Sequence, residues 1–421
     1  MKPLSALITI LALSALSAEP KKILVIGDSQ SEEYRFEIPF SAPASAPFES
    51  NTQNWIELLA EHRPEEVDFG EYRRNLFSYP DVRDAGYEYN WSIPGALTDT
   101  WIEVLNSSFL NDQEYLSSKV TLLDQIDEMD AVVIFLGGND MNTVYSRLHR
   151  NEPPNGWPES VIDQMEEIIE IVQGEDSDIP IVVGNFPDVG GTEKRKLDFP
   201  DRAGRDLASQ YIADANARLK AMLATKSIPV FEVTRVTTDL ISEQPFRLGN
   251  VELFPFGHPE NPPRNLLCRD GFHPSTSTQA RLANMIMTAL NEKASWSLTP
   301  FSDQEILTDI LGLDPAADNE YLAWIDGFAV SNSSLVADPD GDGLDNLGEF
   351  ALDLNPSLPD APTAGSEGAF NFTVKASRTE YVTTLPAVSG DLENWTPFPE
   401  TPPFVLPEPF LRLEFSLRDN Q

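Results

Sequence analysis

The chain has 421 residues, with 68 acidic and 29 basic side chains and a formal net charge of −39 at pH 7. Nucleic acid and anionic membranes need a basic binding surface, so this charge argues against both as partners. The one cysteine, Cys268, cannot form an internal disulfide, and stability must come from the core and any bound metal. The length predicts two or three structural units.

Residues 1–18 have the pattern of a secretory signal peptide. Lys2 precedes an apolar run, and small residues lead up to Ala18. The run is too short for a transmembrane segment, and no later stretch reaches about 20 continuous apolar residues. We therefore expect an exported protein, secreted or at the cell surface, whose mature chain begins near Glu19.

Residues 19–296 alternate short apolar runs with segments of helical periodicity, which is typical of a parallel sheet covered by helices on both faces. The predicted strands are Ile23–Ile26, a run near Tyr87–Trp91, Ala131–Leu136, Ile179–Val183 and Ile228–Phe231. The predicted helices are Asn54–Glu61, Pro158–Val172, Arg205–Ala224 and Thr276–Asn291. Phe36–Phe48 and Asn185–Asp201 are predicted loops, each either a solvated connection or part of a substrate site.

Four segments with polar residues lie where a predicted strand ends or a predicted helix begins. They are Gly27-Asp28-Ser29, NWSIPG with Gly95, FLGGNDM with Asn139, and CRDGFHPS with Asp270 and His273. Read alone, the first is an ordinary turn sequence. A serine nucleophile needs a base such as imidazole, and only His273 follows a carboxylate at short spacing. The other histidines, His62, His149 and His258, have the settings of surface residues.

In this order the four segments resemble the motifs of the SGNH hydrolases, also called GDSL-type esterases and lipases, over about residues 20–295. The resemblance implies a flavodoxin-like three-layer α/β fold around a parallel sheet. It also implies Ser29 as nucleophile and Asp270 and His273 as its activating pair. The Ser29 and Gly95 N–H groups and the Asn139 amide would form the oxyanion hole. Gln30 stands where the Gly-Asp-Ser-Leu motif that gives the family its name has Leu, which leaves the substrate preference open.

Several neighbours of these motifs have structural interpretations. Asp28 and Asp140 are expected to accept backbone hydrogen bonds that hold their loops. Of the aromatic residues Trp91, Trp101 and Phe272, we expect about one to line the pocket and the others to be packed.

These observations predict a secreted serine esterase that hydrolyses carboxylic esters through an acyl-serine intermediate, with no cofactor for catalysis. The expected substrate is a small-molecule or polysaccharide ester, such as a short acyl or acetyl group on a carbohydrate. Two alternatives stay open. One is a GDSL-type lipase or phospholipase, and the other is an inactive surface protein that binds carbohydrate or mediates adhesion.

After residue 296 the sequence predicts a linker with short helices (297–330), an EF-hand-like calcium loop (331–356) and a small β-rich module (366–421). The loop has oxygen ligands at EF-hand spacing, with Gly343 at the sharp turn. The expected ligands are Asp338, Asp340, Asp342, the Leu344 carbonyl, Asn346 and Glu349. The loop resembles those of dockerins and thrombospondin type 3 repeats, which implies a structural Ca²⁺ with a helix on each side. Phe370–Lys375, Tyr381–Leu385 and Phe410–Phe415 are predicted strands of the final module.

Overall fold

The structure is a computed structural model of the chain. It describes residues 19–34, 52–73, 79–83, 85–108, 113–236, 246–248, 251–254, 264–268, 270–313, 320–333 and 337–360, and the backbone of the C-terminal strands. The expected signal peptide, the predicted loop at 36–48 and His258 lie outside the described residues.

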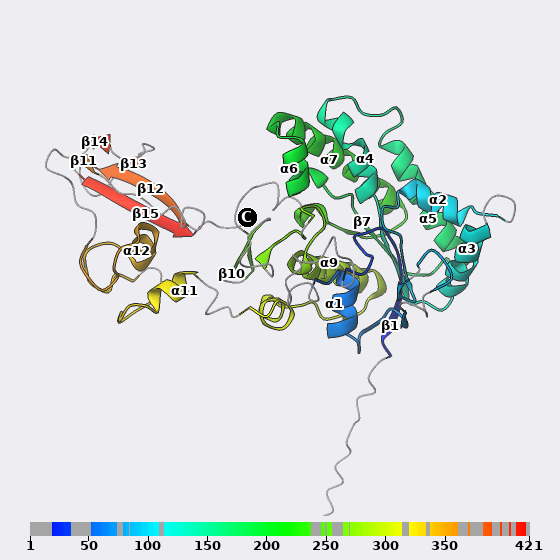
Figure 1. The fold of residues 1–421 in the computed structure, drawn as a ribbon, viewed down its shortest axis with the longest axis horizontal. Coiled ribbons are helices and arrows are strands. Elements are labelled where there is room, and N and C mark those ends of the chain that lie inside the picture. Colours follow the sequence, from blue (N-terminus) through cyan, green and yellow to red (C-terminus); the bar gives the residue numbers. More distant parts are fainter. Residues whose placement is uncertain are drawn as a thin grey trace, which may run out of the picture.

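A parallel sheet forms the centre of the larger, N-terminal unit (Figure 1). Strand β1 (Lys21–Gly27) pairs along one edge with β6 (Ala131–Phe135), and β7 (Ile181–Gly184) and β8 (Val230–Phe231) follow. The other edge of β1 pairs with β2 (Val67–Asp68) near the start of β1 and with β5 (Asn90–Ser92) near its end. This is the 2-1-3-4-5 order of a doubly wound sheet, so the switch point lies between β1 and β6. The flavodoxin-like prediction is confirmed.

Successive residues of each strand pack into different layers, because side chains alternate across a sheet. Ile23 and Val25 join a core cluster with α1 (Trp55–His62) and α9 (Thr276–Ala294). Leu24 and Ile26 join a second cluster on the opposite face. The helices over that face are α2 (Thr98–Leu105), α3 (Gln113–Ile126), α4 (Gly138–His149), α5 (Glu159–Glu175) and α7 (Arg202–Thr225).

Two features of this unit differ from the predictions. Helices α2, α3 and α4 were not among the predicted elements, and the segment 185–201 is not only a loop. It contains a 3₁₀ turn, Val189–Gly191, and the short helix α6, Glu193–Asp198. Side-chain caps, rather than an apolar face, hold the N-termini of these two short elements. Asp188 accepts a hydrogen bond from the Gly190 N–H, and Thr192 accepts one from the Arg195 N–H. Periodicity therefore gives no signal for them.

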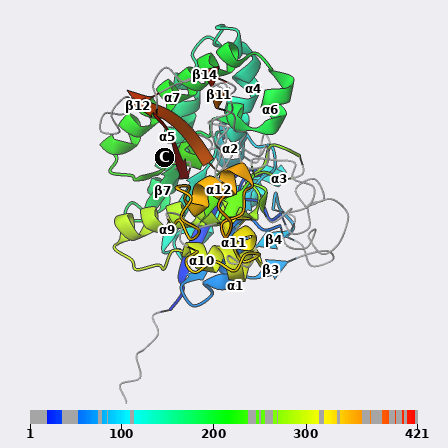
Figure 2. The same cartoon turned by 90° about the vertical axis from the view of Figure 1, so that its left-hand side faces the viewer.

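The packed core continues beyond residue 296, where the sequence suggests a boundary. Leu298, Phe301, Ile306, Leu307 and Leu311 are buried in the same cluster as α1 and α9. Helix α10 (Asp303–Glu305) and the π-helical turn Ile306–Ile310 lie beside α1 (Figure 2). At least residues 298–311 therefore pack with the hydrolase unit.

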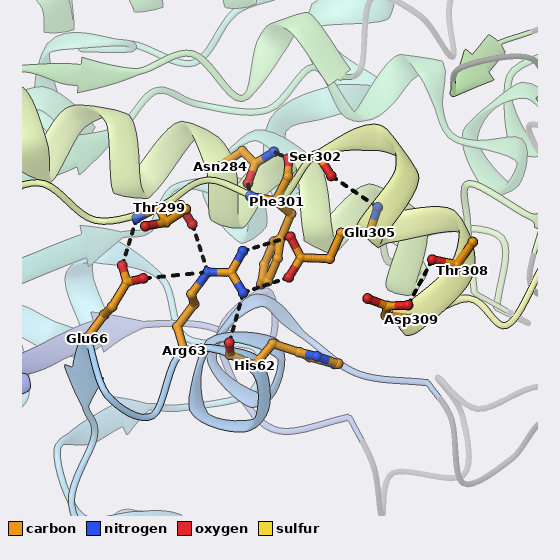
Figure 3. Close-up of polar contacts among 10 residues, drawn as sticks. All are labelled: His62, Arg63, Glu66, Asn284, Thr299, Phe301, Ser302, Glu305, Thr308 and Asp309. Carbon is orange, nitrogen blue, oxygen red and sulfur yellow. Dashed lines mark hydrogen bonds and ion pairs between the residues drawn. The ribbon is translucent and has the colours of Figure 1, made fainter.

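Arg63, the residue that caps the C-terminus of α1, holds this extension in place (Figure 3). Its guanidinium donates to both carboxylate oxygens of Glu305 at 2.7 and 2.8 Å, and its Nε donates to the Thr299 carbonyl at 2.8 Å. The guanidinium carbon also lies 4.4 Å from the centroid of the Phe301 ring. A bidentate, partly buried pair of this kind is stronger than an exposed ion pair.

The C-terminal part lies to one side of the hydrolase unit (Figure 1). Helices α11 (Glu320–Ile325) and α12 (Asn346–Leu352) flank the predicted calcium loop. Antiparallel pairs join β12 (Val382–Ser389) with β13 (Thr396–Pro397) and β15 (Phe410–Leu417), and β11 (Ala369–Phe370) with β14 (Phe404–Val405). Strands β12 and β15 match two predicted strands; of the third, residues 371–375 lie outside the described residues. No helix in the described ranges is long and apolar enough to cross a bilayer.

Candidate active site

Three side chains from two distant segments meet at the carboxyl end of β1. The Ser29 Oγ and the His273 Nε2 are 2.8 Å apart, and the His273 Nδ1 lies 2.5 Å from the Asp270 Oδ2. Since a carboxylate can only accept, the Nδ1 proton faces Asp270 and Nε2 is left to accept from the serine hydroxyl. The sequence-predicted trio is therefore brought into the geometry that general-base activation of a serine requires.

Hydrogen bonds within the loop between Cys268 and α9 fix the positions of Asp270 and His273. The Asp270 Oδ1 accepts the backbone N–H groups of Phe272 and His273, each at 3.0 Å, and the Cys268 N–H donates to the His273 carbonyl at 2.7 Å. Burial pushes the Asp270 pKa up, but the hydrogen bond and charge of His273, with the two backbone donors, leave it below its ordinary value. Asp270 is therefore anionic at neutral pH.

The three predicted oxyanion-hole segments are tied to one another. The Asn139 Nδ2 donates to the Asp28 Oδ2 at 3.3 Å and to the Ala96 carbonyl at 3.1 Å. Asp28 precedes Ser29, and Ala96 follows Gly95. Within the described ranges, the Gly95 N–H has no hydrogen-bond acceptor. The arrangement leaves this N–H available to an incoming oxyanion.

Asp28 and Asp140 accept backbone hydrogen bonds, as predicted. Asp28 accepts from the Gln30 N–H at 2.8 Å, and Asp140 accepts from the Thr98 N–H at 3.1 Å and from the Thr98 hydroxyl at 2.9 Å. Asp140 thereby joins the start of α4 to the start of α2, just after Gly95. Burial raises the Asp28 pKa to about 7, although the Gln30 N–H lowers it.

Glycine is required where β6 turns into α4. Gly137 has φ +100°, and a Cβ atom there would lie 2.2 Å from the ring of Phe186. Such a left-handed turn, without room for a side chain, aims the first turn of α4 back toward β1. It thus places Asn139 beside Asp28.

The aromatic residues near the motifs have two kinds of setting. Trp91 and Trp101 are completely buried, and their indole N–H groups donate to Gln125 and to the Gly27 carbonyl. Phe272 instead lines a small, mainly apolar cavity of about 30 Å³, with Gln30 and Pro274, which flank the serine and the histidine in the chain.

A buried glutamine was missed by the sequence analysis. Gln279 of α9 is completely buried. Its Nε2 donates to the Gln30 carbonyl at 3.2 Å and to the Tyr34 hydroxyl at 3.0 Å, and its Oε1 accepts from the Trp55 N–H at 3.2 Å. It therefore joins the nucleophile turn to the helix that follows His273. No sequence motif marks it, because its partners are over 200 residues away.

The predicted calcium loop brings most of its acidic residues together. Oxygen atoms of Asp338, Asp340 and Asp342 lie within 4.8 Å of one another, and so do those of Asp342, Glu349 and Asp360. Burial, then Asp340 and the other nearby carboxylates, raise the Glu349 pKa to about 8. Asp360 was not predicted, since it lies outside the twelve-residue spacing.

Two other predicted ligands have different settings. The Asn346 Nδ2 donates to the Asn332 carbonyl at 3.0 Å, at the start of α12. The Leu344 N–H donates to the Asp342 Oδ1 at 2.9 Å. Their roles as ligands stay predictions.

A parallel α/β sheet with a serine, a histidine and an aspartate in hydrogen-bonded sequence at its switch point has the architecture of a serine hydrolase. The model of the GDSL-like lipase/acylhydrolase family matches residues 23–286. The chain belongs to this family and is a hydrolase of ester bonds.

Similar solved structures include three esterases and lipases. A family 3 carbohydrate esterase of Clostridium thermocellum is 13% identical over 66% of this chain and 98% of its own, with a TM-score of 0.34. An acetyl xylan esterase is 15% identical over 64% of this chain and 99% of its own, with a TM-score of 0.34. An extracellular lipase of Streptomyces rimosus is 14% identical over 65% and 99%, with a TM-score of 0.39. No curated protein matches the chain.

Proposed function

We propose that the chain is a secreted serine esterase that cleaves carboxylic esters through an acyl-serine intermediate. The observation that carries the proposal is the continuous line of hydrogen bonds from the Ser29 Oγ through His273 to Asp270. The Asp270 side chain is 24% exposed and the His273 side chain 12% exposed, so substrate can reach a site that is still largely shielded from water.

In the first half-reaction the Ser29 Oγ attacks the ester carbonyl carbon while its proton passes to the His273 Nε2. Asp270, anionic at neutral pH, stabilises the imidazolium that forms. The C–O bond to the alcohol then breaks, and His273 gives the proton to the leaving oxygen. In the second half-reaction water, deprotonated by His273, attacks the acyl-serine. The bond between the acyl carbon and the Ser29 Oγ then breaks, His273 returns the proton to Oγ, and the acid leaves.

The negative oxygen of each tetrahedral intermediate would be bound by the Ser29 N–H, the Gly95 N–H and the Asn139 amide. In the resting site the two Asn139 Nδ2 hydrogens are donated to the Asp28 Oδ2 at 3.3 Å and to the Ala96 carbonyl at 3.1 Å, so the amide would exchange one of these bonds for the oxyanion. The Gly95 N–H, which has no acceptor within the described ranges, needs no such exchange, and donors fixed in advance lower the barrier because they need little reorganisation as charge develops.

The substrate we favour is a short acyl ester, such as an acetyl group on a carbohydrate. The supporting observation is the cavity of about 30 Å³ beside Phe272 and Pro274, which is mainly apolar and small. Its lining includes Gln30, the residue after the nucleophile, and its size suits a small acyl group. We propose that this cavity receives the acyl side of the ester.

Export is proposed from the sequence alone. The pattern at residues 1–18 predicts removal of a signal peptide, and the mature chain would begin near Glu19. N-terminal sequencing of the protein recovered from culture medium tests this, and retention of residues 1–18 in the recovered protein would contradict it.

The test of the esterase proposal is hydrolysis of p-nitrophenyl acetate by the wild type and by Ser29→Ala, followed by acetate release from acetylated polysaccharides and glycerides. We expect turnover by the wild type only. Equal rates would favour the rival interpretation, an inactive binding protein. Faster hydrolysis of long-chain esters than of acetate would favour a lipase.

A further inference from the structure

Glu349 is a buried carboxylate that lacks a hydrogen-bond partner among the described residues. It lies in the first turn of α12 and is 1% exposed, and neither of its carboxylate oxygens has a hydrogen-bond partner within the described part of the chain. Burying a charged carboxylate that has no cation or hydrogen-bond donor beside it costs several kcal/mol of folding free energy. A buried carboxylate is therefore expected to have a cation or a donor as its partner in the functional protein.

The side chain points at other carboxylates rather than at a donor. Asp342 and Asp360 have oxygens within 4.8 Å of the Glu349 carboxylate and of each other. Oxygen ligands at about 2.4 Å from a Ca²⁺ ion can be at most about 5 Å apart, so one ion can bind all three. Asp338 and Asp340 form a second group that shares Asp342.

No protein cation from this segment is available to neutralise the group. The chain has no Lys, Arg or His between Ala294 and Val374, a stretch that contains all five carboxylates. An external cation can supply the positive charge that this segment lacks. Carboxylate oxygens favour a hard divalent ion, and several direct carboxylates favour Ca²⁺ over Mg²⁺, which keeps much of its water.

Asp360 reaches the site because the chain folds back after α12. Helix α12 ends at Leu352, and Asp353, which has φ +61°, caps its C-terminus. Beyond it the Asn355 N–H donates to the Asp360 Oδ2 at 3.3 Å, and the Asp360 N–H donates to the Asp342 Oδ2 at 2.8 Å. The residue is thus held against the loop although it lies eleven positions past Glu349.

We propose that residues 338–360 form a Ca²⁺ site in which Asp360, from outside the twelve-residue loop, is an additional ligand. The other carboxylate ligands are Asp338, Asp340, Asp342 and Glu349, and Gly343, with φ +94°, allows the sharp turn between them. Calcium then joins three parts of the chain: the loop, α12 and the segment that leads to the C-terminal strands. Because α12 lies beside β15, the ion also supports that contact.

The test is calorimetric titration of calcium chloride into the full chain after treatment with chelator, in a buffer of moderate salt that screens general charge effects. The variants are Glu349→Gln and Asp360→Asn. Asp326→Asn is the matched control, since Asp326 is exposed at the end of α11 and belongs to neither acidic group. Circular dichroism without calcium checks that each variant is folded.

We expect one Ca²⁺ per wild-type chain, at least tenfold weaker binding in Glu349→Gln and in Asp360→Asn, and unchanged binding in Asp326→Asn. Magnesium chloride should bind at least tenfold more weakly than calcium chloride. Absence of calcium uptake by the wild type would overturn the site. Wild-type affinity in Asp360→Asn, or equal losses in Asp360→Asn and Asp326→Asn, would overturn the assignment of Asp360. Equal affinity for magnesium would overturn the choice of ion.

Discussion

The Asn139 side chain donates a hydrogen bond to Asp28, the residue that precedes Ser29 in the chain. One contact therefore joins the loop after β6 to the loop after β1, across the switch point of the sheet. The same amide nitrogen also donates to the Ala96 carbonyl. Consequently the proposed nucleophile and oxyanion donors are positioned relative to one another by side-chain contacts as well as by the sheet.

Replacing Asn139 tests the proposed oxyanion hole. We expect Asn139→Ala to lower kcat by about a hundredfold or more with a smaller change in KM, because one donor to the developing oxyanion is typically worth ~3 kcal/mol. The measurement is steady-state hydrolysis of p-nitrophenyl acetate. Asn106→Ala, which removes an exposed amide bound to Glu167, is the control. Full activity in Asn139→Ala would show that this amide does not bind the oxyanion.

Shortening Phe272 tests the proposed acyl cavity. Phe272→Ala enlarges a cavity of about 30 Å³, so the ratio of kcat/KM for the butyrate ester to that for the acetate ester should rise severalfold. Phe328→Ala, which removes a ring packed on Trp324 outside the hydrolase unit, is the control. An unchanged ratio in Phe272→Ala would place the acyl group elsewhere.

Glu33 should make stability depend on pH. Burial raises its pKa from 4.5 to about 7, against the hydrogen bonds from Asn90 and the Tyr87 N–H. Between these values the unfolded chain loses the proton and the folded chain keeps it, so the free energy of unfolding falls as pH rises. From pH 5 to pH 7.5 Glu33 should lower the free energy of unfolding by roughly 2 kcal/mol.

Urea unfolding at pH 5 and pH 7.5 measures this decrease, and Glu33→Gln should remove it. Asp28, with its pKa of about 7, adds a contribution of the same sign that the variant retains. Glu103→Gln, at an exposed position of α2, is the control. If wild type and Glu33→Gln lose equal stability between the two pH values, Glu33 is not the source.

The Arg63–Glu305 pair should stabilise the packing of the segment after α9. The hydrogen bond that Arg63 donates to Glu305 is the largest influence on the Glu305 pKa and holds it below the ordinary value of a glutamate. The pair's contribution is therefore present above pH 4.5 and is lost as pH falls further. We expect Glu305→Gln to lower the free energy of unfolding at pH 7 by about 1–2 kcal/mol. Chemical denaturation checks it, and a loss no larger than that of the exposed Glu65→Gln would contradict it.

The sheet and the proposed catalytic residues were predictable because their signals are local. Each strand is a continuous apolar run, and Ser29, Asn139 and the Asp270/His273 pair each stand in a short motif at the end of a strand or start of a helix. Helices α2 to α4 were missed, and α4 begins inside one of these motifs.

Contacts between distant segments could not be predicted in the same way. The Gln279–Gln30 hydrogen bond spans 249 positions, and the Asn139–Asp28 hydrogen bond spans 111. Asp360 joins the acidic group only because the chain turns back after Asp353. None of these depends on periodicity or motif spacing, so only the folded chain reveals them.

The most direct test of the central claim is covalent labelling with diisopropyl fluorophosphate, followed by mass spectrometry of the intact chain and of its peptides. A serine activated by the His273 and Asp270 arrangement should take up one phosphoryl adduct per chain, on Ser29, with loss of esterase activity in proportion to labelling. Ser29→Ala should take up none. An adduct on another residue, or full activity in the labelled protein, would contradict the assignment of Ser29 as the nucleophile.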